Sequence, residues 1–179
     1  MTPAGEGRPN QPAAAEFPAD FLDFVHALNA NGVEYLLVGG YAVGVHGYVR
    51  ATVDIDFFFR RTPENVTRVL AALQEFGAPP VVLDRAHLEA TDTVTAFGEP
   101  PVRIDLLSGI SGVTFDEAAE GAVQVALGSD VLPVIGLRAL CVNKQASGRP
   151  KDRHDLEQLG GATDGNSRAT SRRKRGNRR

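Results

Sequence analysis

The sequence predicts an α+β fold, with helices flanking a mostly antiparallel or mixed β-sheet in a single domain. Its 179 residues suffice for one domain with an apolar core, and 42% hydrophobic and 23% charged residues are typical of a globular chain. Segments with the apolar spacing of amphipathic helices are interspersed with short apolar or alternating runs typical of strands. This order favours helices packed against a sheet.

The first third of the folded unit is predicted to alternate between helix and strand. Apolar residues from Phe17 to Leu28 recur at helical spacing, and Asn31-Gly32 ends that helix. A short apolar run then meets Gly39-Gly40, as expected for a buried strand entering a turn. The predicted elements after the first helix are a strand at Glu34–Val38, a short helix at Tyr41–Tyr48 and a strand at Val53–Phe59.

The middle third is predicted to contain one long helix and an antiparallel pair of strands. Pro63 suits the first turn of a helix, and Gly77 suits its end. Farther on, Gly98-Glu99-Pro100-Pro101 separates two strand-like runs and predicts a tight connection. The predicted elements are a helix at Pro63–Phe76 and strands at Thr93–Phe97 and Val102–Leu107.

The last third is predicted to hold a short helix, a hairpin and two closing helices. The hairpin turn is indicated by Gly128-Ser129-Asp130, and the two helices are separated by Ser147-Gly148-Arg149. The predicted elements are a helix at Phe115–Glu120, strands at Val123–Leu127 and Val131–Val134, and helices at Leu137–Ala146 and Pro150–Leu159.

The two ends of the chain differ in composition from the predicted domain, residues 16–159. Residues 1–15 are rich in Pro, Ala and Gly and predict a disordered leader, while residues 160–179 predict a disordered basic tail of net charge +6. Residues 1–159 then carry a net charge of −9, so metal ions or local basic residues must offset this charge if the substrate is a polyanion. A single cysteine and no apolar run near ~20 residues favour a cytoplasmic protein without a membrane partner.

The most informative feature is a set of three acidic residues in predicted strands. Asp54 and Asp56 are two apart, so both side chains face the same way, while Ile55 faces the opposite side. Asp105 lies in a second apolar strand, and three carboxylates converge if the two strands are neighbours. Oxygen-only ligands suit Mg²⁺, and such a trio can hold two ions for phosphoryl transfer, with Mn²⁺ as an alternative. The alternative for Asp54 and Asp56 is a solvent-facing pair or a structural cation site.

Residues around the acids offer candidate contacts to phosphate. Gly39 and Gly40 open a short helix and let a phosphate approach its N–H groups, although an ordinary strand-to-helix turn is the alternative. Arg50 and Thr52 precede the acids; Arg50 suits a phosphate or, equally, a surface carboxylate. His46 is expected to be a packed, hydrogen-bonded histidine, with contact to the nucleotide or acceptor as the alternative.

These motifs, in this order, resemble the AbiEii/AbiGii-type branch of the nucleotidyltransferase superfamily. The resemblance rests on Gly39-Gly40-Tyr41-Ala42, His46-Gly47, the stretch from Arg50 to Asp56, and a late segment from Lys144 to Asp155. It covers roughly residues 33–159 and implies a nucleotidyltransferase-like fold. One departure is Gly40, where many nucleotidyltransferases have a serine that helps to hold phosphate.

The resemblance also implies roles for the residues. Asp54, Asp56 and Asp105 would bind metal, and Gly39 and Gly40 would cradle the triphosphate. In the late segment, Lys144 would neutralise phosphate charge with Lys151 as a second candidate, and Asp152 and Asp155 would orient the lysine or the substrate. From the sequence alone, Asp152 equally suits a helix start, and Lys144 could extend its amine to solvent.

The leading functional hypothesis is transfer of a nucleoside monophosphate from a nucleoside triphosphate such as ATP to a hydroxyl group. The acceptor is an RNA end, a protein side chain or a small molecule, and the resemblance makes a toxin with an antitoxin partner, or a phage-defence protein, plausible. The alternative is a non-catalytic module that binds nucleotide or RNA and retains the same fold, for which three intact acids would have little use.

Overall fold

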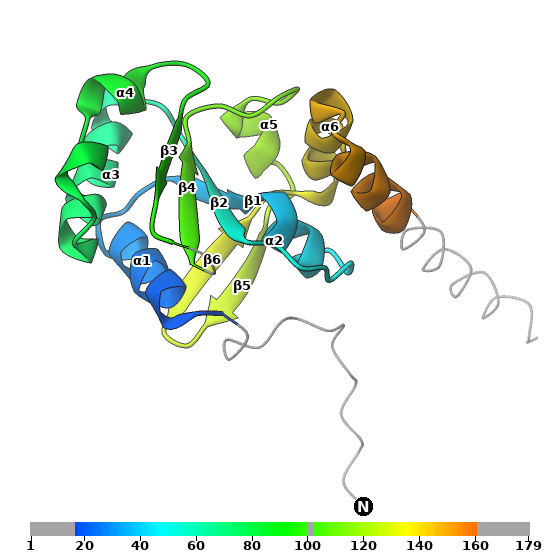
Figure 1. Ribbon diagram of the computed structural model, residues 1–179, viewed down its shortest axis with the longest axis horizontal. Coiled ribbons are helices and arrows are strands. Elements are labelled where there is room, and N and C mark those ends of the chain that lie inside the picture. Colours follow the sequence, from blue (N-terminus) through cyan, green and yellow to red (C-terminus); the bar gives the residue numbers. More distant parts are fainter. Residues whose placement is uncertain (1–16, 100–101, 161–179) are drawn as a thin grey trace, which may run out of the picture.

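The computed structural model describes residues 17–99 and 102–160, which form one six-stranded sheet flanked by helices (Figure 1). The predicted leader and basic tail lie outside the described residues, apart from Gly160. No helix within the described ranges is long and apolar enough to cross a membrane.

The sheet is mixed, as predicted, with the strand order β3-β4-β2-β1-β6-β5. Strand β2 runs parallel to β4 and antiparallel to β1, and β1 runs parallel to β6. The two hairpin-like pairs, β3 with β4 and β5 with β6, are antiparallel, as the turn signals predicted. The strands are β1 (Tyr35–Val38), β2 (Asp54–Phe59), β3 (Val94–Phe97), β4 (Arg103–Leu107), β5 (Val123–Leu127) and β6 (Asp130–Val134).

The helices agree with the predicted periodicity, and two short ones were not predicted. Residues 80–89 form a 3-10 turn and a five-residue helix whose N-cap is Asp84 and whose Leu88 is buried. Segments of this length are too short to show the apolar spacing of a helix, so the sequence did not predict them. The helices are α1 (Ala19–Ala30), α2 (Gly39–Val45), α3 (Pro63–Phe76), η2 (Pro80–Val82), α4 (Arg85–Glu89), α5 (Phe115–Ala119), α6 (Leu137–Ser147) and residues 150–160.

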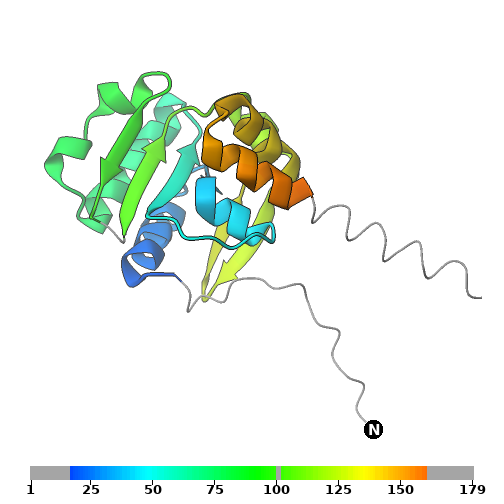
Figure 2. The ribbon, with the colours of Figure 1, turned by 45° about the vertical axis from the view of Figure 1, so that its right-hand side comes forward.

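The helices divide between the two sides of the sheet. Figures 1 and 2 show α1 and α3 packed together on one side, while α2, α6 and residues 150–160 gather on the other. The alternation of β2 accounts for this division, because Phe57 stacks on α1 through Phe21 while Phe58 meets Phe115 of α5 on the opposite face.

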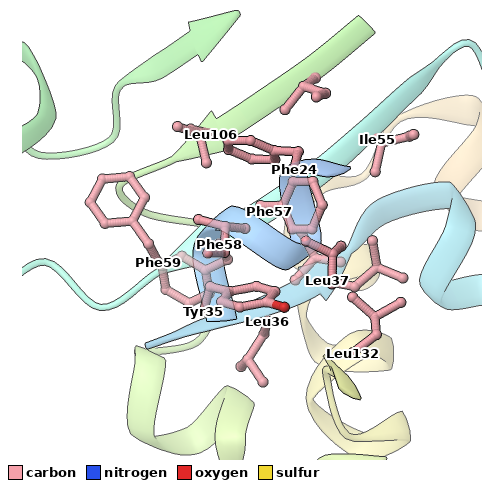
Figure 3. Close-up of a cluster of buried hydrophobic side chains, with 14 of the residues drawn as sticks. Phe24, Tyr35, Leu36, Leu37, Ile55, Phe57, Phe58, Phe59, Leu106 and Leu132 are labelled. Carbon is pink, nitrogen blue, oxygen red and sulfur yellow. The ribbon is translucent and has the colours of Figure 1, made fainter. Parts of the chain in front are cut away.

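The apolar core lies mainly between the sheet and α1. Figure 3 shows the ring of Phe24 close to that of Phe57, and their centroids are 5.4 Å apart in an edge-on arrangement. Ile55 and Phe59, on the same face of β2 as Phe57, are also buried. Burial of this face fixes the orientation of β2, because a one-residue slip would move Phe57 and Phe59 to the acidic face.

Candidate active site

Three carboxylates meet on the face of the sheet opposite to α1. Asp56 of β2 is in register with Asp105 of the parallel strand β4, and Asp54 lies two residues before Asp56 on the same face. Carboxylate oxygens of the three residues all lie within 4.8 Å of one another. The convergence expected from the sequence is therefore present, and Ile55 is buried on the other face.

The three acids repel one another. The pKa of Asp56 is raised from 3.8 to about 6, first by burial and then by the negative charges of Asp54 and Asp105. Lys151 and Lys144 lower it only in part. A cluster of oxygen ligands with unbalanced negative charge suits a hard divalent cation, so the donor set fits Mg²⁺ or Mn²⁺.

Thr52 holds Asp54 in place. Its hydroxyl donates to the Asp54 carboxylate at 3.0 Å and lies 3.2 Å from the backbone carbonyl of the same residue. Gly40 packs directly on Thr52, because a Cβ built on Gly40 would lie 2.8 Å from the Thr52 hydroxyl. The loop before β2 thus fixes one acid and touches the start of α2.

Gly39 is the first residue of α2, so the helix begins two residues earlier than predicted, and it ends three residues earlier, at Val45. It has a φ of +66°, and a Cβ there would collide with the Asp56 carboxylate. Glycine is therefore required both by the backbone conformation and by the close approach of the acid. Val38, which precedes the helix, offers no side-chain cap to its first N–H groups.

Arg103 is a member of this site that the sequence analysis did not single out. Its Nε and Nη2 donate to the two carboxylate oxygens of Asp105, each at 2.8 Å. The available signal was its position two residues before Asp105 in the same strand, which places both side chains on one face. A charged residue at the start of a strand is common, so this spacing alone indicates no role.

A buried ion-pair network lies behind the cleft. Lys144, only 2% exposed, donates to Asp152 at 2.8 Å and lies 2.9 Å from an oxygen of Asp155, and both acids are fully buried. Burial alone would raise the pKa of Asp152, but hydrogen bonds from Arg149 and Lys144 outweigh it and lower the pKa to about 2. The alternative in which Lys144 extends its amine to solvent is wrong.

Arg50 joins this network to the loop before β2. It donates twice to Asp155, through Nε at 2.7 Å and Nη2 at 2.9 Å. The carboxylate partner considered from the sequence is thus present, but it is buried and not on the surface. His46 contacts the Ile135 carbonyl at 2.7 Å, in agreement with the packed histidine expected there.

A cleft of about 560 Å³ connects these groups. It is lined by the three acids, both glycines, Arg50, Thr52, Lys144 and Lys151, whereas Asp152 and Asp155 are buried against Lys144 and do not line it. Lys151 is exposed on this cleft and makes no ion pair among the described residues. The cleft therefore brings together a cluster of acids, the turn at Gly39 and an exposed lysine.

Comparisons with known proteins give one family match. A family model described as "Nucleotidyl transferase of unknown function" (DUF2204) matches residues 19–175. No curated protein matches the chain. Among solved structures, the chain is similar to the lincosamide antibiotic adenylyltransferase LnuA bound to lincomycin, with a TM-score of 0.49, 13% identity, and 82% of this chain and 98% of that chain covered.

A second solved structure is ANT(2")-Ia in complex with adenylyl-2"-tobramycin. Its TM-score is 0.49 and its identity 14%, with 80% of this chain and 87% of that chain covered.

Proposed function

Because the chain belongs to the DUF2204 family of nucleotidyl transferases, we propose that it transfers a nucleoside monophosphate from a nucleoside triphosphate to a hydroxyl group and releases pyrophosphate. The observation that carries this proposal is the carboxylate trio Asp54, Asp56 and Asp105 beside the Gly39 turn. Divalent cations bound by such a trio supply activation of the attacking oxygen and stabilisation of the charge on the phosphates.

The strand order supports separate places for the two substrates along the cleft. Strand β2 lies between β1 and β4, so Asp54 and Asp56 lie between the end of β1 at Gly39 and Asp105 on β4. We assign the triphosphate to the β1 side and the acceptor hydroxyl to the Asp105 side. Asp54 and Asp56 are then shared by both, as an in-line displacement requires.

Two groups support placing the triphosphate at the Gly39 turn. The first N–H groups of α2, at Gly39 and Gly40, have no side-chain cap and suit phosphate oxygens. Lys151 is the cation we expect to meet the phosphates, because the ammonium of Lys144 is already matched by two carboxylates. Lys144 and Asp152 then act by positioning the loop before β2 and the helix that carries Lys151.

The test is transfer of label from each α-labelled nucleoside triphosphate, with Mg²⁺, to total cellular RNA, to protein or to a pool of small hydroxyl compounds. We expect one nucleotide and one acceptor class to become labelled, and Asp56→Asn to lower the rate by at least ~100-fold. A binding module that retains the fold predicts no label with any donor. Equal labelling by wild type and Asp56→Asn would contradict the proposed site.

The finer assignment to toxins of the AbiEii/AbiGii type rests on the motif string from Gly39 to Asp155. It predicts that expression of the wild type arrests growth of a bacterial host and that Asp56→Asn relieves the arrest. Normal growth at high expression of an active protein would exclude a general toxin and leave the transferase proposal intact.

A further inference from the structure

We propose that Arg103 acts as the counter-ion of Asp105 in the metal-free site and competes with the divalent cation for that carboxylate. This inference rests on the proposed function, since it takes the carboxylate trio as the cation site.

The geometry of the pair places Arg103 in direct competition with a cation for Asp105. The guanidinium donates to both oxygens of Asp105, so each oxygen that could bind a cation already accepts a short hydrogen bond. Planar two-point pairing of this kind is the strong form of an arginine–carboxylate contact. Each oxygen keeps a further lone pair, so a cation at Asp105 would share the carboxylate with the guanidinium and be repelled by its positive charge.

The exposure of the two partners shows which one can leave. The Asp105 side chain is 7% exposed and lies within β4, whereas the Arg103 side chain, which also lines the cleft, is 42% exposed. Arg103 can therefore move into solvent without a desolvation penalty, while Asp105 stays beside the other two acids. The pair is built so that Arg103 is exchangeable and Asp105 is not.

The charges around Arg103 explain what the pair contributes. Arg103 is in register with Asp54 on β2, so its charge faces a second acid of the trio as well as Asp105. Without it, the repulsion among three carboxylates within 4.8 Å of one another would be offset only in part, by Lys151 and Lys144. Arg103 thus stabilises the metal-free fold and, for the same reason, lowers the affinity of the site for a free cation.

The test is a titration of Mn²⁺ alone, without nucleotide, followed by electron paramagnetic resonance. We expect Arg103→Met, which keeps the length but lacks the charge and the donors, to bind Mn²⁺ at least tenfold more tightly than wild type. Lys151→Met is the matched control, because it removes one positive charge from the same cleft without touching Asp105. The affinity of Lys151→Met for Mn²⁺ should increase at most about threefold, as expected when one screened charge is removed.

A second readout separates competition from a simple structural role. Metal-free Arg103→Met should melt at a lower temperature than wild type while binding Mn²⁺ more tightly. If Arg103→Met does not fold, Arg103→Lys keeps a charge without the two-point geometry and should still gain severalfold in affinity.

Three outcomes overturn the inference. Mn²⁺ affinity that is unchanged or lower in a folded Arg103 variant would show that Arg103 does not compete. An equal gain in Lys151→Met would assign the effect to general charge. Absence of Mn²⁺ binding by wild type and every variant would overturn the proposed function as well. Mn²⁺ binding by wild type that is not tighter in the Arg103 variants would contradict only the role of Arg103.

Discussion

Replacement of Asp56 by Asn should stabilise the metal-free protein at neutral pH. The pKa of Asp56 rises from 3.8 to about 6 because the carboxyl is buried and faces Asp54 and Asp105. A carboxyl with a raised pKa in the folded state opposes folding once it ionises, so wild type loses stability as the pH rises from about 4 to 6. Asn is nearly the same size and has no charge, so the variant escapes this loss.

The size of the effect follows from the two pKa values. The ionisation penalty on wild type is roughly 1 kcal/mol at pH 4.5 and roughly 3 kcal/mol at pH 7.5. The stability of Asp56→Asn relative to wild type should therefore increase by about 2 kcal/mol between these pH values. The assay is urea unfolding of both proteins in a metal chelator at each pH, with Asp23→Asn on the exposed face of α1 as the control.

The sign of the pH dependence tests whether the ionised Asp56 carboxylate destabilises the metal-free fold. A relative stability of Asp56→Asn that stays constant, or that falls from pH 4.5 to 7.5, would show that Asp56 carries no unbalanced charge. The three acids would then be an ordinary polar surface cluster. The control variant should show no comparable change across the same interval.

Three further predictions concern the groups around the acids. Lys144→Ala leaves two buried carboxylates without their ammonium and should cost about 3–5 kcal/mol, measured by urea unfolding; a loss below 1 kcal/mol would contradict the buried network. The pKa of Asp152 is lowered to about 2, so its stabilising effect should be complete above about pH 4 and fade as the pH falls toward 2. The measurement is the difference in free energy of unfolding between wild type and Asp152→Asn as a function of pH. A difference that does not change with pH would show that Asp152 is not held as a charged carboxylate. Lys151→Ala should weaken triphosphate binding about tenfold with little change in melting temperature, because its side chain is exposed; unchanged binding in a calorimetric titration would remove Lys151 from the phosphate site.

The secondary structure could be predicted because its signals are local. Pro63 and Gly77 bound α3 at the predicted positions, since a proline suits the first turn and Gly77 adopts a φ of +80° at the end. The start of α2 was misplaced, because Gly39 resembles a turn residue and its role depends on the Asp56 carboxylate from another strand. The η2–α4 segment was missed because it is too short to show a period.

The site could be predicted only as far as local alternation extends. The shared face of Asp54 and Asp56 follows from their spacing, but the parallel pairing that brings Asp105 beside them joins segments almost 50 residues apart and had to be assumed. The pairing of Arg103 with Asp105 requires a side-chain conformation that no spacing specifies. For Lys144, the burial depends on carboxylates supplied by the following helix, which periodicity within α6 cannot reveal.

The central claim is that the three acids support transfer of a nucleoside monophosphate, and parallel reactions with α-labelled and γ-labelled triphosphate test it most directly. With Mg²⁺ and the acceptor class found in the labelling screen, wild type should transfer the α label to the acceptor and release the γ label as pyrophosphate. A chelator, Asp54→Asn or Asp56→Asn should abolish both. Transfer of the γ label to the acceptor, or release of inorganic phosphate in place of pyrophosphate, would contradict the account.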